Sequence, residues 1–142
     1  MQISGVLRSK GDVVVTIAPE ETVPTLLERL REHRVGALVV SHDGRTVEGI
    51  VSERDVVRRL CTDGQRLLTE TVGDIMTTDV HTCLPADHVD SLMVTMTERR
   101  IRHIPVVVDG VLRGIVSIGD VVKHRMDELS EERDHLEAYI SR

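Results

Sequence analysis

The sequence predicts a mixed α/β (α+β) fold in which one β-α-β-β-α unit occurs twice and a long C-terminal helix follows. The first observation is an internal repeat, because Thr16-Ile17-Ala18-Pro19 recurs 66 residues later as Thr82-Cys83-Leu84-Pro85. The second is that Gly49-Ile50-Val51-Ser52 recurs as Gly114-Ile115-Val116-Ser117, at an offset of 65. A match that stays in register across several elements indicates duplication of one structural unit.

Each copy predicts the same order of elements. A short β-rich segment ends at a proline, which cannot donate to a central sheet ladder. An amphipathic helix follows, with apolar residues at the i, i+3, i+4, i+7 spacing of one helix face. Two apolar runs joined by an Asp-Gly turn then predict a hairpin, and a last helix follows. The predicted elements before that last helix are residues 13–17, 23–34, 37–40 and 47–51 in the first copy and residues 80–83, 89–100, 104–108 and 111–116 in the second.

The copies divide the chain into three parts. Residues 1–62 hold the first motif with its N-terminal lead-in, residues 63–124 hold a linker and the second motif, and residues 125–142 form a helical extension. The linker is expected at residues 62–66, which are polar and contain glycine. One copy alone would leave a sheet face bare, so we expect the two copies to pack on each other as a pair.

Composition excludes several classes of protein. Lys and Arg number 18 against 24 Asp and Glu, a net charge of −6, which argues against bulk nucleic-acid binding. Tyr139 is the only residue among Phe, Trp and Tyr, so aromatic stacking of bases is not available. Cys61 and Cys83 are isolated, which predicts neither a disulfide framework nor a zinc site. No signal peptide or apolar run of the roughly 20 residues that span a bilayer is recognisable, and we expect a cytoplasmic protein.

The repeated Ser-x-x-Asp at the start of each last helix is the candidate binding feature. Ser52 and Asp55 form the first pair, and Ser117 and Asp120 form the second. A carboxylate can accept hydrogen bonds from both cis hydroxyls of a ribose, and a helix N-terminus attracts phosphate. The alternative is a plain helix cap, with the aspartate favoured by the helix dipole. Two copies in one duplicated frame favour ligand binding.

These segments resemble the signature of CBS motifs. The resemblance is carried by Gly-Ile-Val-Ser-Glu-Arg-Asp at 49–55, Gly-Ile-Val-Ser-Ile-Gly-Asp at 114–120, Val-Gly-Ala-Leu-Val-Val at 35–40, Ile-Arg-His-Ile-Pro-Val at 101–106 and the lead-in at 72–77. It covers nearly the whole chain and is closest to stand-alone CBS-pair proteins of bacteria and plant organelles. It implies a pseudo-twofold pair (a Bateman module) with two clefts for adenosine-containing ligands, which dimerises into a flat disc. It also implies a regulatory role without chemistry of its own.

The resemblance assigns residues to two clefts. The stronger cleft is expected to contain Ser52, Arg54, Asp55, Thr77, Val80, Arg102, His103, Ile104 and Pro105. The weaker cleft is expected to contain Lys10, Asp12, Val13, Gly36, Ala37, Ser117 and Asp120.

The two clefts are expected to differ in affinity. Arg102 and His103 would place positive charge at the phosphate end of the stronger cleft, and an arginine fork suits phosphate. Gly36 and Ala37 offer no cation at the corresponding place. Without aromatic rings, the adenine would lie between aliphatic groups, expected to be Val80, Ile104 and Pro105.

The tail carries an apolar seam at coiled-coil spacing. Its members, spaced 4, 3, 4, 3 and 4, are Val122, Met126, Leu129, Arg133, Leu136 and Ile140. The seam predicts either a helix that packs on its own module or a dimer contact or docking helix; we favour the second.

The sequence therefore predicts a homodimeric, non-enzymatic sensor of adenine nucleotides, with AMP as the first candidate and ADP, ATP or NAD also possible ligands. Ligand would stabilise one arrangement of the two motifs, and an unidentified regulated enzyme would read it. No obligatory cofactor, metal, nucleic acid or membrane is expected. The alternatives are an NAD(H)-binding redox-sensor module, with a redox enzyme as partner by resemblance only, and a ligand-free dimeric scaffold. An enzyme is disfavoured because no nucleophile triad, phosphate-binding loop or metal signature is present.

Overall fold

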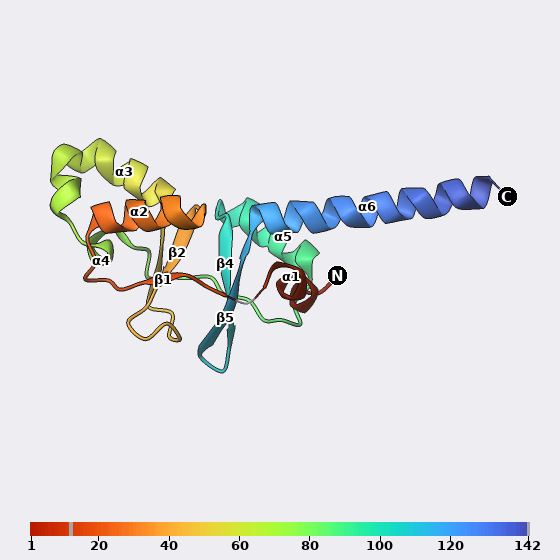
Figure 1. Ribbon diagram of the computed structural model, residues 1–142, viewed down its shortest axis with the longest axis horizontal. Helices are drawn as coiled ribbons and strands as arrows, with labels where there is room; N and C mark the ends of the chain where they lie inside the picture. The colour runs from red at the N-terminus through yellow and green to blue at the C-terminus, as the bar shows by residue number, and fades with distance from the viewer. Residues whose placement is uncertain (12, 142) are drawn as a thin grey trace.

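The computed structural model describes residues 1–11 and 13–141 and has two α+β halves followed by a long helix (Figure 1). This is the fold class that the sequence predicts. A 3₁₀ helix over Gly64–Thr69 connects the halves. The other elements are α1 (Ile3–Lys10), β1 (Thr16–Ile17), α2 (Val23–His33), β2 (Ala37–Val40), β3 (Gly49–Ser52), α3 (Glu53–Asp63), α4 (Val72–Ile75), α5 (Val89–Arg99), β4 (His103–Val108), β5 (Val111–Ser117) and α6 (Ile118–Ile140).

The two sheets repeat the same pairing. In the first, β1 runs parallel to β2 with Ile17 opposite Val40, and β2 runs antiparallel to β3. In the second, β4 and β5 are antiparallel, and Cys83 pairs in parallel with Val106. Both members of the second parallel pair lie 66 residues after their counterparts in the first, so the repeat read from the sequence is also a repeat of strand pairing.

The strand predicted over residues 80–83 is wrong, because only the bridge at Cys83 forms there. The segment serves both sheets: Thr77 pairs with Ile50 of the first sheet, and Cys83 pairs with Val106 of the second. The chain between these contacts crosses from one half to the other and cannot also be a strand. The predicted strand over residues 13–17 is likewise reduced to Thr16–Ile17.

Both predicted serine caps are present. The Ser52 hydroxyl accepts the Asp55 N–H, and the Asp55 carboxylate accepts the Ser52 N–H at 2.8 Å. Ser117 and Asp120 repeat the arrangement at the start of α6. Reciprocal caps of this kind satisfy two orphan donors of the first turn.

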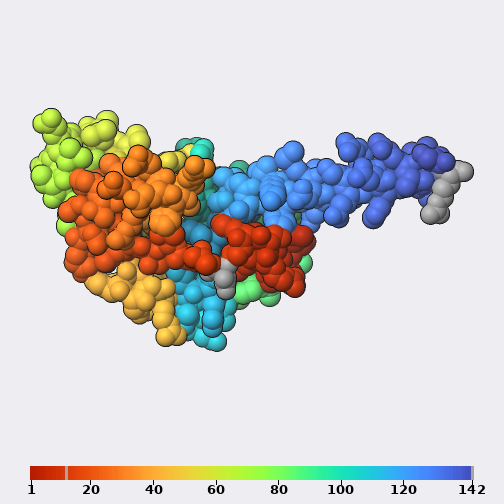
Figure 2. All heavy atoms as spheres, in the orientation of Figure 1, coloured from red at the N-terminus to blue at the C-terminus, as the bar shows by residue number. Residues whose placement is uncertain are grey.

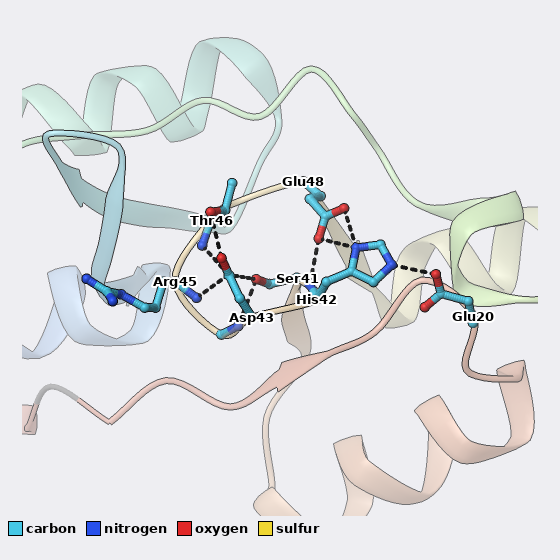
Figure 3. A network of polar contacts seen from close by, with 8 residues as sticks. Glu20, Ser41, His42, Asp43, Arg45, Thr46 and Glu48 are labelled. Carbon is cyan, nitrogen blue, oxygen red and sulfur yellow. Dashed lines mark hydrogen bonds and ion pairs between the residues drawn. The ribbon is translucent and has the colours of Figure 1, made fainter.

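The turn between β2 and β3 is fixed by side chains (Figure 3). The Asp43 carboxylate accepts the N–H groups of Arg45 and Thr46 at 2.8 and 2.7 Å, and these bonds hold the pKa of Asp43 well below its usual range. His42 lies between Glu20 and Glu48, and its hydrogen bond to Glu20 is the main cause of a raised pKa. The predicted Asp-Gly turn is thereby tied to the loop before α2.

The predicted linker is helical. Helix α3 continues to Asp63, and the 3₁₀ helix buries Leu67 in the first half while Arg66 pairs with Asp63 at 3.1 Å. Because Gly64, Gln65 and Arg66 are exposed and lack apolar side chains, composition favours a loop for this segment.

The lead-in helices are exchanged between the halves. Ile3 and Val6 of α1, which precede the first motif, are fully buried in the core of the second half. Leu67, Val72 and Ile75, which precede the second motif, lie in the core of the first. Each half therefore needs a segment from outside its own motif to complete its core, and this holds the halves together.

No helix within residues 1–11 and 13–141 is long and apolar enough to cross a membrane.

Candidate functional site

A cleft of about 120 Å³, partly open to solvent, lies between the two halves. A boundary between two domains is a common place for a small-molecule site. The start of β2, the β3–α3 junction, the crossing segment before Cys83 and the turn before β4 form its walls. The lining residues are Gly36, Ala37, Ile50, Ser52, Glu53, Arg54, Asp55, Arg58, Thr77, Asp79, Val80, His81, Arg100, Ile101, Arg102 and His103.

The cleft brings together most of the residues expected in the stronger site. Those that line it are Ser52, Arg54, Asp55, Thr77, Val80, Arg102 and His103. Ile104 does not line it, because its side chain is 1% exposed and belongs to the core of the second half. Pro105 is buried in β4 opposite Ile115. The aliphatic residues at the cleft are Ala37, Ile50, Val80 and Ile101 instead.

Gly36 and Ala37 were expected with Asp120, and the structure places them at the Asp55 cleft. The reason is the strand register: Ala37 of β2 lies opposite Ser52 of β3, where α3 begins. The start of β2 is therefore next to the start of α3 in the same half.

Asp55 presents one carboxylate oxygen to the cleft. Oδ2 accepts the Ser52 N–H at 2.8 Å and the Ser52 hydroxyl at 3.1 Å. No donor in the described part of the chain bonds Oδ1. The capping box thus fixes the carboxylate while one oxygen is left to accept from a ligand.

Four arginines surround the cleft: Arg54, Arg58, Arg100 and Arg102. All four are exposed, and none forms an ion pair with another residue among those described. A group of guanidinium ions without carboxylate partners favours a bound anion, and phosphate is well matched to their geometry. The N-terminus of α3 adds further N–H groups at the same place.

Arg58 and Arg100 were not predicted from the sequence. Arg58 lies four residues after Arg54, so both belong to one face of α3. Arg100 ends α5 in the left-handed conformation, with φ 54°, as Arg34 ends α2 with φ 53°. Arg100 lies 66 residues after Arg34, at the offset of the repeat, which marks a shared helix end but carries no information about a ligand.

His103 lies between the two Ser-Asp pairs. It is opposite Ser117 in the β4–β5 ladder, and it also lines the Asp55 cleft beside Gly36. Burial, followed by the charge of Lys10, lowers the pKa of His103. The imidazole is therefore neutral near pH 7 and offers a hydrogen bond rather than a charge.

The second Ser-Asp pair, Ser117 and Asp120, differs from the first in having a lysine beside its carboxylate. The Lys10 ammonium contacts Asp120 Oδ2 at 2.6 Å and donates to the Ile115 carbonyl at 2.8 Å. Burial acts to raise the pKa of Asp120, but the hydrogen bonds from Lys10 and Ser117 prevail and the pKa lies below its usual range.

The contrast with the first half is local. The Ile50 carbonyl, the counterpart of Ile115, accepts the Thr77 N–H at 2.9 Å. The two carbonyls therefore have different donors, and Lys10 adds at Asp120 Oδ2, which also accepts the Ser117 N–H at 2.9 Å, a cation for which Asp55 has no counterpart among the described residues. Val13 is exposed, and Asp12 lies outside the described residues.

Cys83 is a core residue, as the repeat predicts. Its side chain is buried, and burial raises the pKa of the thiol to about 12. Cys61 is exposed on α3.

The chain resembles known proteins over nearly its whole length. A mitochondrial CBS domain-containing protein of Arabidopsis thaliana, CBSX3, is 40% identical over 146 residues, which cover 97% of this chain and 71% of the relative. The crystal structure of a CBS-domain containing protein from Agrobacterium tumefaciens superposes with a TM-score of 0.85 at 40% identity, covering 88% of this chain and 99% of the other. A CBS domain protein from Pyrobaculum aerophilum, complexed with AMP, has a TM-score of 0.74 at 28% identity, with coverage of 84% and 89%.

The CBS-domain family model matches the chain twice, at residues 11–62 and 72–127. The two matches correspond to the two halves of the fold. The protein thus belongs to the CBS-domain family and contains a pair of CBS domains.

Proposed function

We propose that this protein is a regulatory sensor that binds an adenosine-containing ligand, AMP first, in the Asp55 cleft. The main support is that a carboxylate with a free oxygen lies in the same cleft as four arginines without ion-pair partners. These groups match the two polar parts of a nucleotide, the ribose diol and the phosphate. The AMP complex of the Pyrobaculum relative supports adenosine as the ligand class.

The ligand would contact both halves. Asp55 accepts from the ribose hydroxyls, and the phosphate lies against Arg102 and the N-terminus of α3. The adenine lies against Val80 and Ile101, the aliphatic residues of the crossing segment and of the second half. Since both halves contribute, bound nucleotide stabilises one arrangement of the two CBS domains, and a regulated enzyme reads that arrangement.

The Asp55 cleft is the single strong site in this proposal. Lys10 compensates the charge of Asp120 through Oδ2, which weakens that carboxylate as an acceptor for ribose hydroxyls. We therefore expect about one nucleotide per chain.

Calorimetric titration of AMP into Asp55→Ala and Asp120→Ala tests the site. Asp55→Ala should weaken binding at least about tenfold, because a hydrogen bond to a charged group contributes about 1.5–3 kcal/mol. Asp120→Ala is the matched control and should leave the affinity within about twofold. Loss of binding in the Asp120 variant alone would refute the assignment, and steady turnover of ATP or NADH would refute the regulatory role.

A dinucleotide such as NAD(H) is the second candidate. A groove next to the cleft shares Arg54, Arg58, Arg100 and Arg102 with it and continues toward Met96 and Ile118. The second nucleotide half would lie in this groove. Native mass spectrometry of freshly purified protein distinguishes the candidates by the mass of any bound nucleotide; a ligand-free scaffold would carry none and bind none.

The same proposal includes a homodimer. Val57 on α3 and Val94 on α5 are exposed apolar residues on the helical surfaces of the two halves. Val57 aligns with Val122 of α6 in the repeat, and both are exposed. Exposed apolar residues at repeated positions support association with a second copy. A light-scattering mass equal to one chain would exclude it.

A further inference from the structure

Helix α6 leaves the body of the molecule (Figures 1 and 2). At its start it packs against α1 and α5, and Val121 is completely buried there. From residue 129 to residue 141 every side chain is exposed. A helical segment as short as residues 129–141 has little stability of its own in water when it is isolated. The projecting part therefore needs a partner.

The projecting helix carries an apolar seam that nothing in the described chain covers. Its five apolar members range from 44% exposed at Val122 to 81% exposed at Ile140. The seam is interrupted once by Arg133, which is paired only along its own helix, with Asp134 and Glu137. The seam residues are Val122, Met126, Leu129, Arg133, Leu136 and Ile140. Spacings of 4 and 3 place them at the a and d positions of a coiled coil.

We propose that α6 pairs with α6 of a second copy as an antiparallel coiled coil whose twofold axis passes residue 131. In this register Val122 meets Ile140 of the second copy, Met126 meets Leu136, and Leu129 meets Arg133. All six seam positions are then paired within the described helix. A shift by one heptad in either direction leaves two of them without a partner. A twofold arrangement uses the same surface on both copies.

The charges beside the seam support the antiparallel direction. Lys123 and Glu137 occupy e positions, which lie opposite each other in this register and form two ion pairs across the dimer. Parallel pairing would place Arg133 opposite Arg133 of the second copy in the seam. It would also place Glu132 near Glu137 of the second copy. Antiparallel pairing has one like-charge contact, between Glu132 and Glu132 of the second copy near the axis. Two favourable Lys123–Glu137 pairs offset it.

A shallow hollow at the base of α6 fits the same register. It is lined by Ile118, Gly119, Val122, Lys123, Met126 and Asp127. Ile140 of the second copy would arrive at this hollow and cover the apolar part of it. Lys123 also lines the hollow, and in this register Glu137 of the second copy would lie beside it.

Disulfide trapping tests this arrangement in the full chain, in a Cys61→Ser background that removes the exposed native thiol. Under mild oxidation, Met126→Cys combined with Leu136→Cys should give a covalent dimer, whereas either single variant should give none. The reason is axial distance: residue 126 lies about 15 Å from residue 126 of an antiparallel partner, at about 1.5 Å per residue. A covalent dimer from Met126→Cys alone would show parallel pairing, and no covalent dimer from the double variant would show that α6 does not pair. Either result overturns the proposal.

Charge variants give a second readout. Lys123→Glu should at least halve the yield of the covalent dimer at low salt, and adding Glu137→Lys should restore it. Glu131→Lys is the matched control, because residue 131 points away from the seam and its substitution should change nothing. No restoration by the double swap would contradict the register.

This inference rests on association into a homodimer, but neither on nucleotide binding nor on contact through Val57 and Val94, because antiparallel pairing about residue 131 places the two bodies at opposite ends of the paired helices. A dimeric mass without disulfide trapping would leave the homodimer standing and remove α6 from its interface. Neither the presence nor the absence of disulfide trapping would change the expected loss of AMP binding in Asp55→Ala.

Discussion

Lys10 distinguishes two carboxylates that are otherwise equivalent by sequence and by cap geometry. Asp55 and Asp120 each close a capping box with a serine, but only Asp120 has an ammonium group at 2.6 Å. The Ser-x-x-Asp repeat made both aspartates predictable as caps and candidate ligand groups. The repeat alone could not show which one carries a cation, because Lys10 is separated from Asp120 by 110 residues and reaches it through the packing of α1; only the family resemblance assigned Lys10 to the Asp120 cleft.

Lys10→Met should open the second cleft. The Asp120 carboxylate and the Ile115 carbonyl lose their donor, while the aliphatic part of the side chain is retained. We expect calorimetric AMP stoichiometry to rise from about one toward two per chain, with the Asp55 site unchanged. Lys10→Arg keeps the positive charge and should stay near one. A stoichiometry of two in the unsubstituted protein would contradict the blocking role of Lys10.

His103 should make stability depend on pH. Its pKa in the folded protein lies below the ordinary 6.5, mainly through burial and then through Lys10 and Arg102, against the opposite effect of Glu53 and Asp120. The unfolded chain therefore binds the proton more tightly than the folded chain. Stability is lost as pH falls from above 6.5 through the lowered folded pKa, and it is retained above 6.5.

The comparison with His103→Gln isolates this effect from the other histidines, such as His42, whose pKa is shifted in the opposite direction. Denaturant unfolding between pH 7.5 and 5 should show a larger loss for the unsubstituted protein than for the variant. Equal losses would mean that His103 does not contribute.

At the scale of elements, the helices and hairpins within the two motifs followed from local pattern, because apolar periodicity, serine caps and Asp-Gly turns are local signals; α1, α4 and the 3₁₀ helix were not predicted. The segment between Thr77 and Cys83 did not follow from local pattern, since its backbone partners are Ile50 and Val106 in two different sheets. The role of the glycine that is repeated at positions 49 and 114 could not be predicted from the sequence either. A lead-in side chain from another element lies directly over each of the two glycines, Met76 over Gly49 and Leu7 over Gly114.

Gly49→Ala should destabilise the protein more than Gly114→Ala. A Cβ at Gly49 would lie 2.9 Å from the Thr77 carbonyl oxygen, a backbone atom held by the Ile50 pair, and 2.7 Å from Met76 Sδ. At Gly114 the near atoms belong only to the Leu7 side chain, which can move. We expect about 1–3 kcal/mol at Gly49, the range for overpacking, and less at Gly114. Urea unfolding of both variants checks the order; Gly5→Ala, with no contact nearer than 3.6 Å and a position inside α1, is the control without a clash and should not destabilise the protein.

At the scale of the whole molecule, the exchange of lead-in helices decides how the two halves behave. The repeat predicted that the halves pack together, on the argument that one copy leaves a sheet face bare. It did not predict that α1 enters the core of the second half, because nothing in the sequence of α1 says which half buries Ile3. A ligand that bridges the halves acts on a body that is already tied together at two places.

The exchange predicts that the two halves unfold as one unit. Ile3→Ala removes a fully buried side chain from the core of the second half, and Leu67→Ala removes one from the core of the first. Each should cost about 2–5 kcal/mol and shift one common unfolding transition. Hydrogen exchange should then accelerate in both halves of each variant, since neither core is complete without the segment that leads into the other motif. Two separate transitions, with Ile3→Ala moving only the one that belongs to the second half, would contradict this coupling. Independent halves could not transmit the binding of one nucleotide to the whole pair, so the same measurement tests the physical basis of the proposed sensor.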